Sequence, residues 1–195
     1  MMPNTILFNK AIADVVERLQ KDDYIAGLFP NMYGRAERHH RYENNKRVII
    51  PIVYDRNGEY IDVRPSDRVG NNSFWYVRDG QDVVQGGLAY RPRITAIVSG
   101  VFWFGTDKDY RVIEEVKNRL LYRLNNMTIP NGRLVVNKIY EECDHVFEDF
   151  TITDEHIPFM MHPYGGLRFE CEMSVQQDCI TIGSFNKQSY NEDYE

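Results

Sequence analysis

The stretch that decides the fold is Leu167–Gln176, which reads LRFECEMSVQ. Apolar residues hold every odd position in it, and polar or charged residues hold every even one. A period of two is typical of a β-strand with one buried and one solvated face. We therefore expect a long antiparallel strand whose odd-numbered side chains are buried. Its even-numbered side chains, from Arg168 to Gln176, should face solvent or another subunit.

The 195 residues suit a single domain, 1–182, followed by an extended polar tail, 183–195. Hydrophobic residues make up 43% of the chain, which is enough for a core, and the net charge of −6 argues against non-specific DNA binding as the main role.

Cys143, Cys171 and Cys179 form no CxxC pair and no secretory signal opens the chain, which favours free thiols in a reducing compartment. We expect no membrane span, because no apolar run approaches about 18 residues.

Helical spacing of apolar residues predicts two helices. The first runs through Phe8–Leu19, with Asn4 or Thr5 as its cap. The second starts after Thr106, which would form a capping box with Asp109, and it stops near Asn125 and Asn126. Its expected buried stripe is Ile113, Val116, Leu120 and Leu124.

Two further strands stand out. Val48–Tyr54 is β-branched, and Pro51 inside it indicates an edge strand or a bulge. Asn57-Gly58 predicts a two-residue hairpin turn from this strand into Tyr60–Val63. Arg93–Phe104 is a long apolar strand that we expect at the centre of the sheet. The remaining strand candidates are Leu134–Tyr140 and His145–Ile152.

The other segments are polar or rich in glycine. We interpret Asn31–Arg47 as an exposed loop or arm and Asp154–Pro163 as a loop. Arg64–Tyr90 carries one short strand candidate, Phe74–Val77, and is expected to be a long excursion or a small hairpin outside the main sheet. The order of elements predicts an α+β fold, with a mostly antiparallel sheet and two helices packed on one face.

No residue pattern predicts catalysis strongly. Cys143-Asp144-His145 suggests a nucleophile and a base, but neighbours on a strand alternate faces, so Asp144 would point away. His39, His40, His145, His156 and His162 do not have the spacing of a structural zinc site. Gly86-Gly87 and Gly165-Gly166 are read as turn glycines, since neither pair lies in a phosphate-loop motif. We expect no catalytic residue, metal or cofactor.

Three segments are candidates for contacts with partners. The first is basic, and it would face the acidic segment Glu141–Glu155 of a neighbouring copy or a channel that holds DNA. The second is an aromatic cluster in the excursion, and the third is the polar tail, each with aromatic side chains suited to an interface. The residues are Arg35, Arg38, Arg41, Lys46 and Arg47 in the first, Phe74, Trp75 and Tyr76 in the second, and Phe185, Tyr190 and Tyr194 in the third.

The order of elements resembles that of the tail-terminator (tail-completion) proteins of long-tailed phages and related neck ring proteins. The resemblance covers Thr5–Gln177 in outline and rests on order and pattern, without an invariant motif. The chain differs from this pattern by its longer 64–90 segment, its 154–163 loop and its tail. The matching segments are Asn9–Leu19, Val48–Tyr54, Ile94–Phe104, Asp107–Leu124 and Leu167–Val175.

The resemblance implies a virion structural protein that forms a ring of identical subunits, in six or twelve copies, around the DNA channel. Its partners would be other neck, tail or portal-side proteins, and it would be assembled in the host cytoplasm, without catalysis, cofactor or membrane. Two alternatives stay open. One is a small cytoplasmic hydrolase that uses the acidic and histidine residues of Glu141–His162, and the other is a protein-binding module that is not viral.

Overall fold

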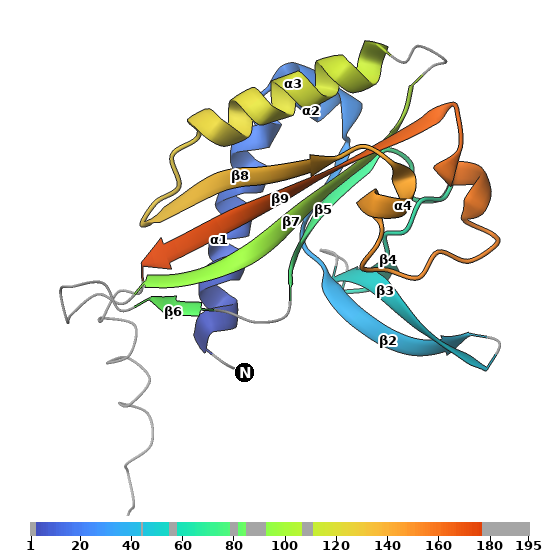
Figure 1. The fold of residues 1–195 in the computed structure, drawn as a ribbon, viewed down its shortest axis with the longest axis horizontal. Coiled ribbons are helices and arrows are strands. Elements are labelled where there is room, and N and C mark those ends of the chain that lie inside the picture. Colours follow the sequence, from blue (N-terminus) through green and yellow to red (C-terminus); the bar gives the residue numbers. More distant parts are fainter. Residues whose placement is uncertain are drawn as a thin grey trace, which may run out of the picture.

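The computed structural model describes residues 3–43, 45–54, 58–78, 82–84, 93–106 and 111–176. Its main sheet has the strand order β1-β5-β7-β9-β8, and a short β6 also pairs with β7 (Figure 1). The expected α+β class is confirmed: one pair of described strands, β1 and β5, is parallel, and the others are antiparallel. The bounds are β1 Asn31–Arg35, β5 Asn72–Val77, β6 Asp82–Val84, β7 Arg93–Gly105, β8 Gly132–Tyr140 and β9 Tyr164–Gln176.

Strands β7 and β9 form the centre of this sheet. Each has 13 residues, and they pair along their whole length, from Arg93 opposite Gln176 to Gly105 opposite Tyr164. The odd-numbered side chains of β9 are buried as predicted, with Leu167, Phe169, Cys171 and Met173 all at 0% exposure. The alternation read from the sequence therefore describes the main core correctly.

Helices α1 (Pro3–Gln20) and α3 (Arg111–Asn126) cover one face of the sheet, as expected (Figure 1). Val116, Leu120 and Leu124 of α3 are buried there, while Ile113 is half-buried. The expected cap of the first helix is wrong, because helical structure already begins at Pro3, and proline suits a first turn. The capping box with Asp109 lies outside the described residues, and the Thr106 hydroxyl donates to the Pro163 carbonyl at 2.7 Å.

A short helix that the sequence analysis missed, α2 (Asp23–Leu28), joins α1 to β1. Its N-cap Asp22 accepts hydrogen bonds from the backbone N–H groups of Tyr24 and Ile25. Arg119 and Arg123 of α3 also donate to this buried carboxylate, at 2.9 and 2.6 Å. Burial acts to raise the pKa of Asp22, but the two arginines outweigh it and lower the pKa to about 2. One carboxylate thus joins α2 to α3.

A second, three-stranded sheet has the order β2-β3-β4. Its strands are β2 (Glu37–Glu43), β3 (Lys46–Tyr54) and β4 (Tyr60–Asp62). The prediction of a loop or arm over Asn31–Arg47 is wrong in its secondary structure, because this segment forms β1, β2 and the start of β3. Its strand character was hidden because most β2 side chains are exposed and polar, so they leave no apolar alternation.

Pro51 lies in the central strand of this sheet, which contradicts the expected edge position. The register places Pro51 opposite Val63, just beyond the end of β4, and the Pro51 carbonyl accepts from the Val63 N–H at 3.1 Å. Proline therefore removes only the reciprocal bond, at the point where the β3–β4 ladder ends. The hairpin into β4 is confirmed, but Tyr54 lies opposite Tyr60, so residues 55–59 form a connection longer than two residues. Gly58 has the positive φ of +86° that such turns require, and Asn57 lies outside the described residues.

Helix α4 (Cys143–Val146) and the following residues cover part of the other face of the main sheet (Figure 1). The strand expected at His145–Ile152 is therefore wrong, and the expected 154–163 loop contains a 3₁₀ turn, η1 (Ile157–Met160). Val146, Phe147 and Phe150 pack here in a second core. Because this core covers the face of the sheet opposite α1 and α3, β5 and part of β7 are buried on both faces.

This second core overturns the prediction for the aromatic cluster. Phe74 and Trp75 are 0% exposed and Tyr76 is 1% exposed, because β5 is a strand of the main sheet and not an outlying hairpin. Arg64, at the start of the expected excursion, is also buried. Three adjacent aromatic residues in a strand fill both cores and leave no exposed contact surface. Residues 79–81 and 85–92, which include Gly86-Gly87, lie outside the described residues.

Gly165 and Gly166 are strand residues opposite Phe104 and Trp103, not turn glycines. A Cβ at Gly165 would lie 3.0 Å from Ile113 Cδ1, and one at Gly166 would lie 3.2 Å from Val146 Cγ1. Their role is therefore close packing of α3 and α4 onto the two faces of β9.

Gly100 provides a test of this packing. A Cβ there would lie 2.7 Å from the buried Trp75 ring, so we expect Gly100→Ala to lower the free energy of unfolding by about 1–3 kcal/mol through overpacking. Gly27 in α2 is the control, because a Cβ there meets nothing within 4 Å, and Gly27→Ala should change stability by no more than about 1 kcal/mol, upward. Urea unfolding measures both, and equal stability of the two variants would contradict the packing.

Candidate functional site

A buried charge cluster lies on the polar face of β9. Arg168, expected to face solvent or another subunit, is 0% exposed, so that expectation is wrong for this residue. Its guanidinium donates to Glu148 at 2.7 Å and to Asp149 at 3.2 Å, and it lies 4.1 Å from the centre of the Tyr140 ring. Glu170, at 8% exposure, is also buried. The even-numbered side chains near the start of β9 are buried because α4 and the residues after it cover them.

Arg78 completes this cluster. It donates to Asp149 at 3.0 Å and to Glu170 at 3.1 Å, and it also bonds Glu148. Burial would raise the pKa values of Glu148 and Asp149, but their hydrogen-bond donors and the nearby arginines lower both. The cluster therefore holds residues 148–149 in a charged state against β9 and β5.

A second charge cluster joins the small sheet to residue 151. The buried Arg64 guanidinium donates to Asp62 at 2.7 Å, to Glu43 at 3.1 Å and to the Thr151 carbonyl at 3.1 Å. Arg41 binds Glu43 as well and lies 3.6 Å from Asp62. This network sets the position of β2 and β4 relative to the body.

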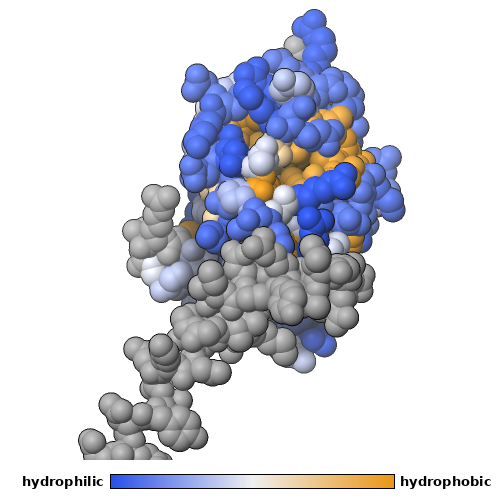
Figure 2. Space-filling model, turned by 90° about the vertical axis from the view of Figure 1, so that its left-hand side faces the viewer, coloured by the Kyte–Doolittle hydropathy of each residue, from blue (hydrophilic) through white to orange (hydrophobic). Residues whose placement is uncertain are grey.

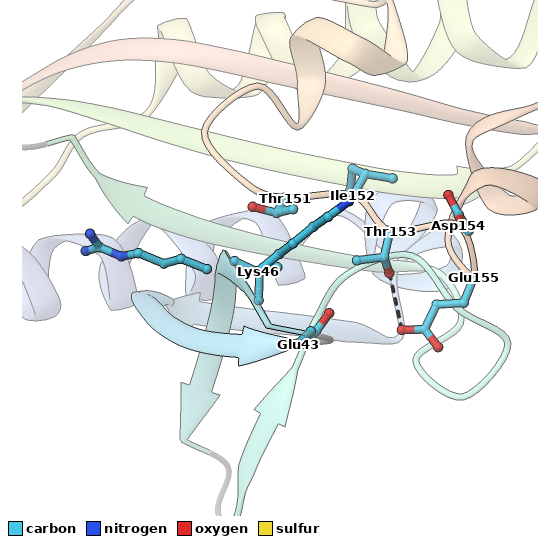
Figure 3. Close-up of a pocket in the computed structure, with 9 residues that line it drawn as sticks. Glu43, Lys46, Thr151, Ile152, Thr153, Asp154 and Glu155 are labelled. Atoms are coloured by element: carbon cyan, nitrogen blue, oxygen red, sulfur yellow. Dashed lines mark hydrogen bonds between the residues drawn. The ribbon is translucent and has the colours of Figure 1, made fainter.

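Beside this cluster the surface forms a hollow of about 530 Å³ between the start of β3 and the 151–155 segment (Figure 3). Lys46 of β3 faces the 153–155 segment, which contributes Asp154 and Glu155, across the hollow (Figure 3), and Arg47 also lines it. Glu155 accepts a hydrogen bond from Thr153 at 3.3 Å. The hollow thus presents positive charge from β3 and negative charge from the facing segment. The remaining lining residues are Glu43, Val48, Thr151, Ile152 and Thr153.

The predicted basic residues take different positions. Arg35 is half-buried and donates to Asn9 at 3.0 Å, and Arg41 is bound to the Glu43 and Asp62 carboxylates. Arg38 is half-buried on β2. Lys46 and Arg47 are exposed, and no ion pair joins either to another residue within the described part of the chain. The structure therefore brings Lys46 and Arg47 together and separates them from Arg35. The predicted tail residues Phe185, Tyr190 and Tyr194 lie outside the described residues.

The cysteine and histidine candidates do not form a nucleophilic pair. Burial, and then the charge of Asp144, raises the pKa of Cys143, which disfavours the reactive thiolate. His145 is exposed on α4 with Nδ1 3.3 Å from Glu142. His156 is buried elsewhere, 2.8 Å from the Thr153 hydroxyl, and burial followed by the charge of Arg64 lowers its pKa. Within the described ranges, no three His, Cys, Asp or Glu side chains gather as metal ligands.

Sequence reasoning missed Arg64 and the tight hairpin between β2 and β3. Glu43 lies opposite Lys46, which leaves two positions between the strands, and Asn45, the described one, has a φ of +61°. Asparagine tolerates this left-handed conformation, so the Asn-Asn pair was the available signal for the hairpin. Asp62, two residues before Arg64, is a local partner, but Glu43 and the Thr151 carbonyl reach Arg64 only through the fold, so no local signal marked its burial.

Among known proteins, no family model matches the chain and no curated protein matches it significantly. None of the helices in the described ranges is long and apolar enough to cross a membrane.

Asp149 tests the buried charge cluster. Asp149→Asn removes the anion that binds Tyr76, Arg78 and Arg168, and we expect it to lower the free energy of unfolding at pH 7 by about 2–4 kcal/mol. Because the pKa of Asp149 is lowered in the folded state, its contribution is present above pH of about 4 and disappears as the pH falls through the folded-state pKa. The difference between variant and wild type in urea unfolding should therefore shrink below pH 4. Asp154→Asn, on the exposed wall of the hollow, is the control and should have little effect at either pH.

Proposed function

We propose that this chain is a ring-forming structural protein of a virion, of the tail-terminator or neck type, which surrounds the DNA channel between head and tail. In this role it acts by assembly and not by catalysis. It would be assembled in the host cytoplasm and function in the particle.

The observation that carries the proposal is the projecting β2–β3 hairpin, which stands away from the body in Figure 1. It is paired over seven residues of β2, from Glu37 opposite Ile52 to Glu43 opposite Lys46. Most of β2 is exposed, and the first residues of β3, Lys46 and Arg47, are exposed too. A stiff charged hairpin that leaves the body is well suited to reach an adjacent subunit.

The arrangement of elements supports the same proposal. Helix α1 precedes β3 and its hairpin partner β4, the long strand β7 is followed by α3, and the long strand β9 comes last among the described elements. The resemblance to tail-terminator proteins rests on these elements and takes residues 31–47 as irregular, whereas β1 and β2 lie there. The burial of Phe74, Trp75 and Tyr76 removes one predicted contact surface but leaves the hairpin and the tail.

Two other surface features are suited to contacts between subunits. Tyr54 and Tyr60 pair with ring centres 5.1 Å apart on the small sheet, and they are 66% and 72% exposed. Figure 2 shows apolar side chains at the surface, within a hydrophilic border, on the side of the molecule where β8 begins and β9 ends. Exposed tyrosines and apolar areas are typical of interfaces.

The hydrolase alternative requires the acidic and histidine residues of Glu141–His162 to act on one substrate. In the structure, Glu148 and Asp149 are bound to Arg168, while Cys143 and His156 line different hollows. This distribution offers no common set of reacting groups, and we therefore prefer the structural role.

Solution molar mass tests the proposal directly. Light scattering over a concentration series should give multiples of the 23.0 kDa chain that rise toward six or twelve copies. A strict monomer at every concentration, together with absence of the protein from purified particles by mass spectrometry, would overturn the ring function.

Deletion of the polar tail should separate folding from assembly. We expect removal of 183–195 to shift the thermal unfolding midpoint by no more than about 2 °C, because surface changes cost little. The same deletion should reduce the assembled fraction in light scattering. A large fall in the unfolding midpoint would show instead that the tail belongs to the folded core.

A further inference from the structure

Strand β3 leaves one backbone position, Arg47, unpaired beside the hollow of Figure 3. The Ile49 N–H donates to the Thr151 hydroxyl at 3.0 Å, and the Ile49 carbonyl accepts from the Thr151 N–H at 2.8 Å. The Ile49 backbone groups therefore point away from β2. Because this direction alternates along an antiparallel strand, the backbone groups of Arg47 point the same way, toward the 151–155 segment.

Along the rest of its length, this edge of β3 has hydrogen-bond partners. β4 pairs with residues 52–54, Val63 bonds to Pro51, and Thr151 bonds to Ile49. At Arg47, neither the N–H nor the carbonyl has a hydrogen-bond partner within the part of the chain that the structure describes. An open strand edge of this kind is a template on which an extended segment can add.

The hollow also specifies the chemistry of an occupant. The buried Val48 and the half-buried Ile152 both line it, which suits a small apolar side chain. Lys46 and Arg47 favour carboxylates on one side, and Asp154 and Glu155 favour a cation on the other. The third carboxylate, Glu43, is already bound by Arg41 and Arg64.

The sequence of residues 177–195 fits this description. It contains the β-branched run Ile180–Ile182, then the cation Lys187, and then the carboxylates Glu192, Asp193 and Glu195. β9 ends on the side of the molecule opposite the tip of the β2–β3 hairpin (Figure 1). Nineteen extended residues can span up to about 60 Å, which is enough to leave the body and reach an adjacent molecule.

We propose that part of the segment 177–195 of a second copy of this chain adds as a strand to β3 at Arg47 and occupies the hollow. Lys46 and Arg47 then bind its carboxylates, and the facing acidic wall binds Lys187. The inference rests on the proposed function, since it assigns the contact between neighbouring subunits of the ring.

A fluorescent peptide of residues 177–195, with Cys179→Ser, tests the contact. The receptor is the full-length chain with Glu192→Lys, Asp193→Lys and Glu195→Lys, so that its own tail does not compete. Fluorescence anisotropy should show saturable binding. Adding Lys46→Glu and Arg47→Glu to the receptor should weaken it at least tenfold, whereas Lys138→Glu, an exposed lysine on β8, should leave it unchanged.

Charge exchange makes the test specific. A peptide with Lys at 192, 193 and 195 should bind the chain that carries Lys46→Glu and Arg47→Glu with its natural tail, and it should not bind the chain with Lys46 and Arg47. Rescue of this kind requires direct proximity of the two charge groups. Failure of the natural peptide to bind, or equal binding by all four pairs of peptide and receptor, overturns the inference.

The backbone contact is tested by comparing Arg47→Pro with Arg47→Ala. Both remove the charge, but only proline removes the N–H, and this side of β3 already accommodates Pro51. Arg47→Pro should bind at least fivefold more weakly than Arg47→Ala, with both variants folded by circular dichroism. Equal binding overturns strand addition. Light scattering tests the ring separately. If the chain forms six or twelve copies but does not bind the peptide, the ring proposal stands and this contact is wrong.

Discussion

The structure depends on the antiparallel pairing of β7 and β9, 13 residues each, at the centre of the main sheet. Both faces of this ladder are covered near Gly165 and Gly166, by α3 on one side and by α4 on the other. A strand buried on both faces must place its polar positions among other protein groups, and a buried charge without a partner is costly. Arg168 is therefore the residue whose burial has to be compensated.

The carboxylates that neutralise Arg168 also position the rest of the molecule. Glu148 and Asp149 bind Arg168, which fixes the chain just before Thr151. Thr151 in turn bonds to Ile49 of β3, and its carbonyl accepts from Arg64. Through these successive contacts the central sheet positions the small sheet and the hairpin that projects from it. The position of the hairpin thus depends on the ion pairs that the buried Arg168 forms with Glu148 and Asp149.

This arrangement gives the proposed assembly a physical basis. The body is held by two apolar cores, while the hairpin keeps Lys46 and Arg47 without an ion pair in the described residues and leaves one backbone position of β3 open. Charges on exposed surfaces contribute little to folding and much to the choice of partner. The same hairpin can therefore be stable in the monomer and available to a neighbour.

The sequence by itself determined the α+β class, the buried stripes of α1 and α3, and the alternation of β9, because apolar periodicity reports local structure wherever one face meets a core. It did not reveal β2, whose exposed polar residues carry no such period, or the burial of Trp75 and Arg168, which follows from segments far apart in the chain. The candidate site also follows from segments far apart in the chain. Arg47 and Glu155 line one hollow only because Arg168 and Arg64 hold the 148–151 segment in place. Local pattern predicts which residues are buried, and only tertiary contacts decide which charges are neutralised and which remain free.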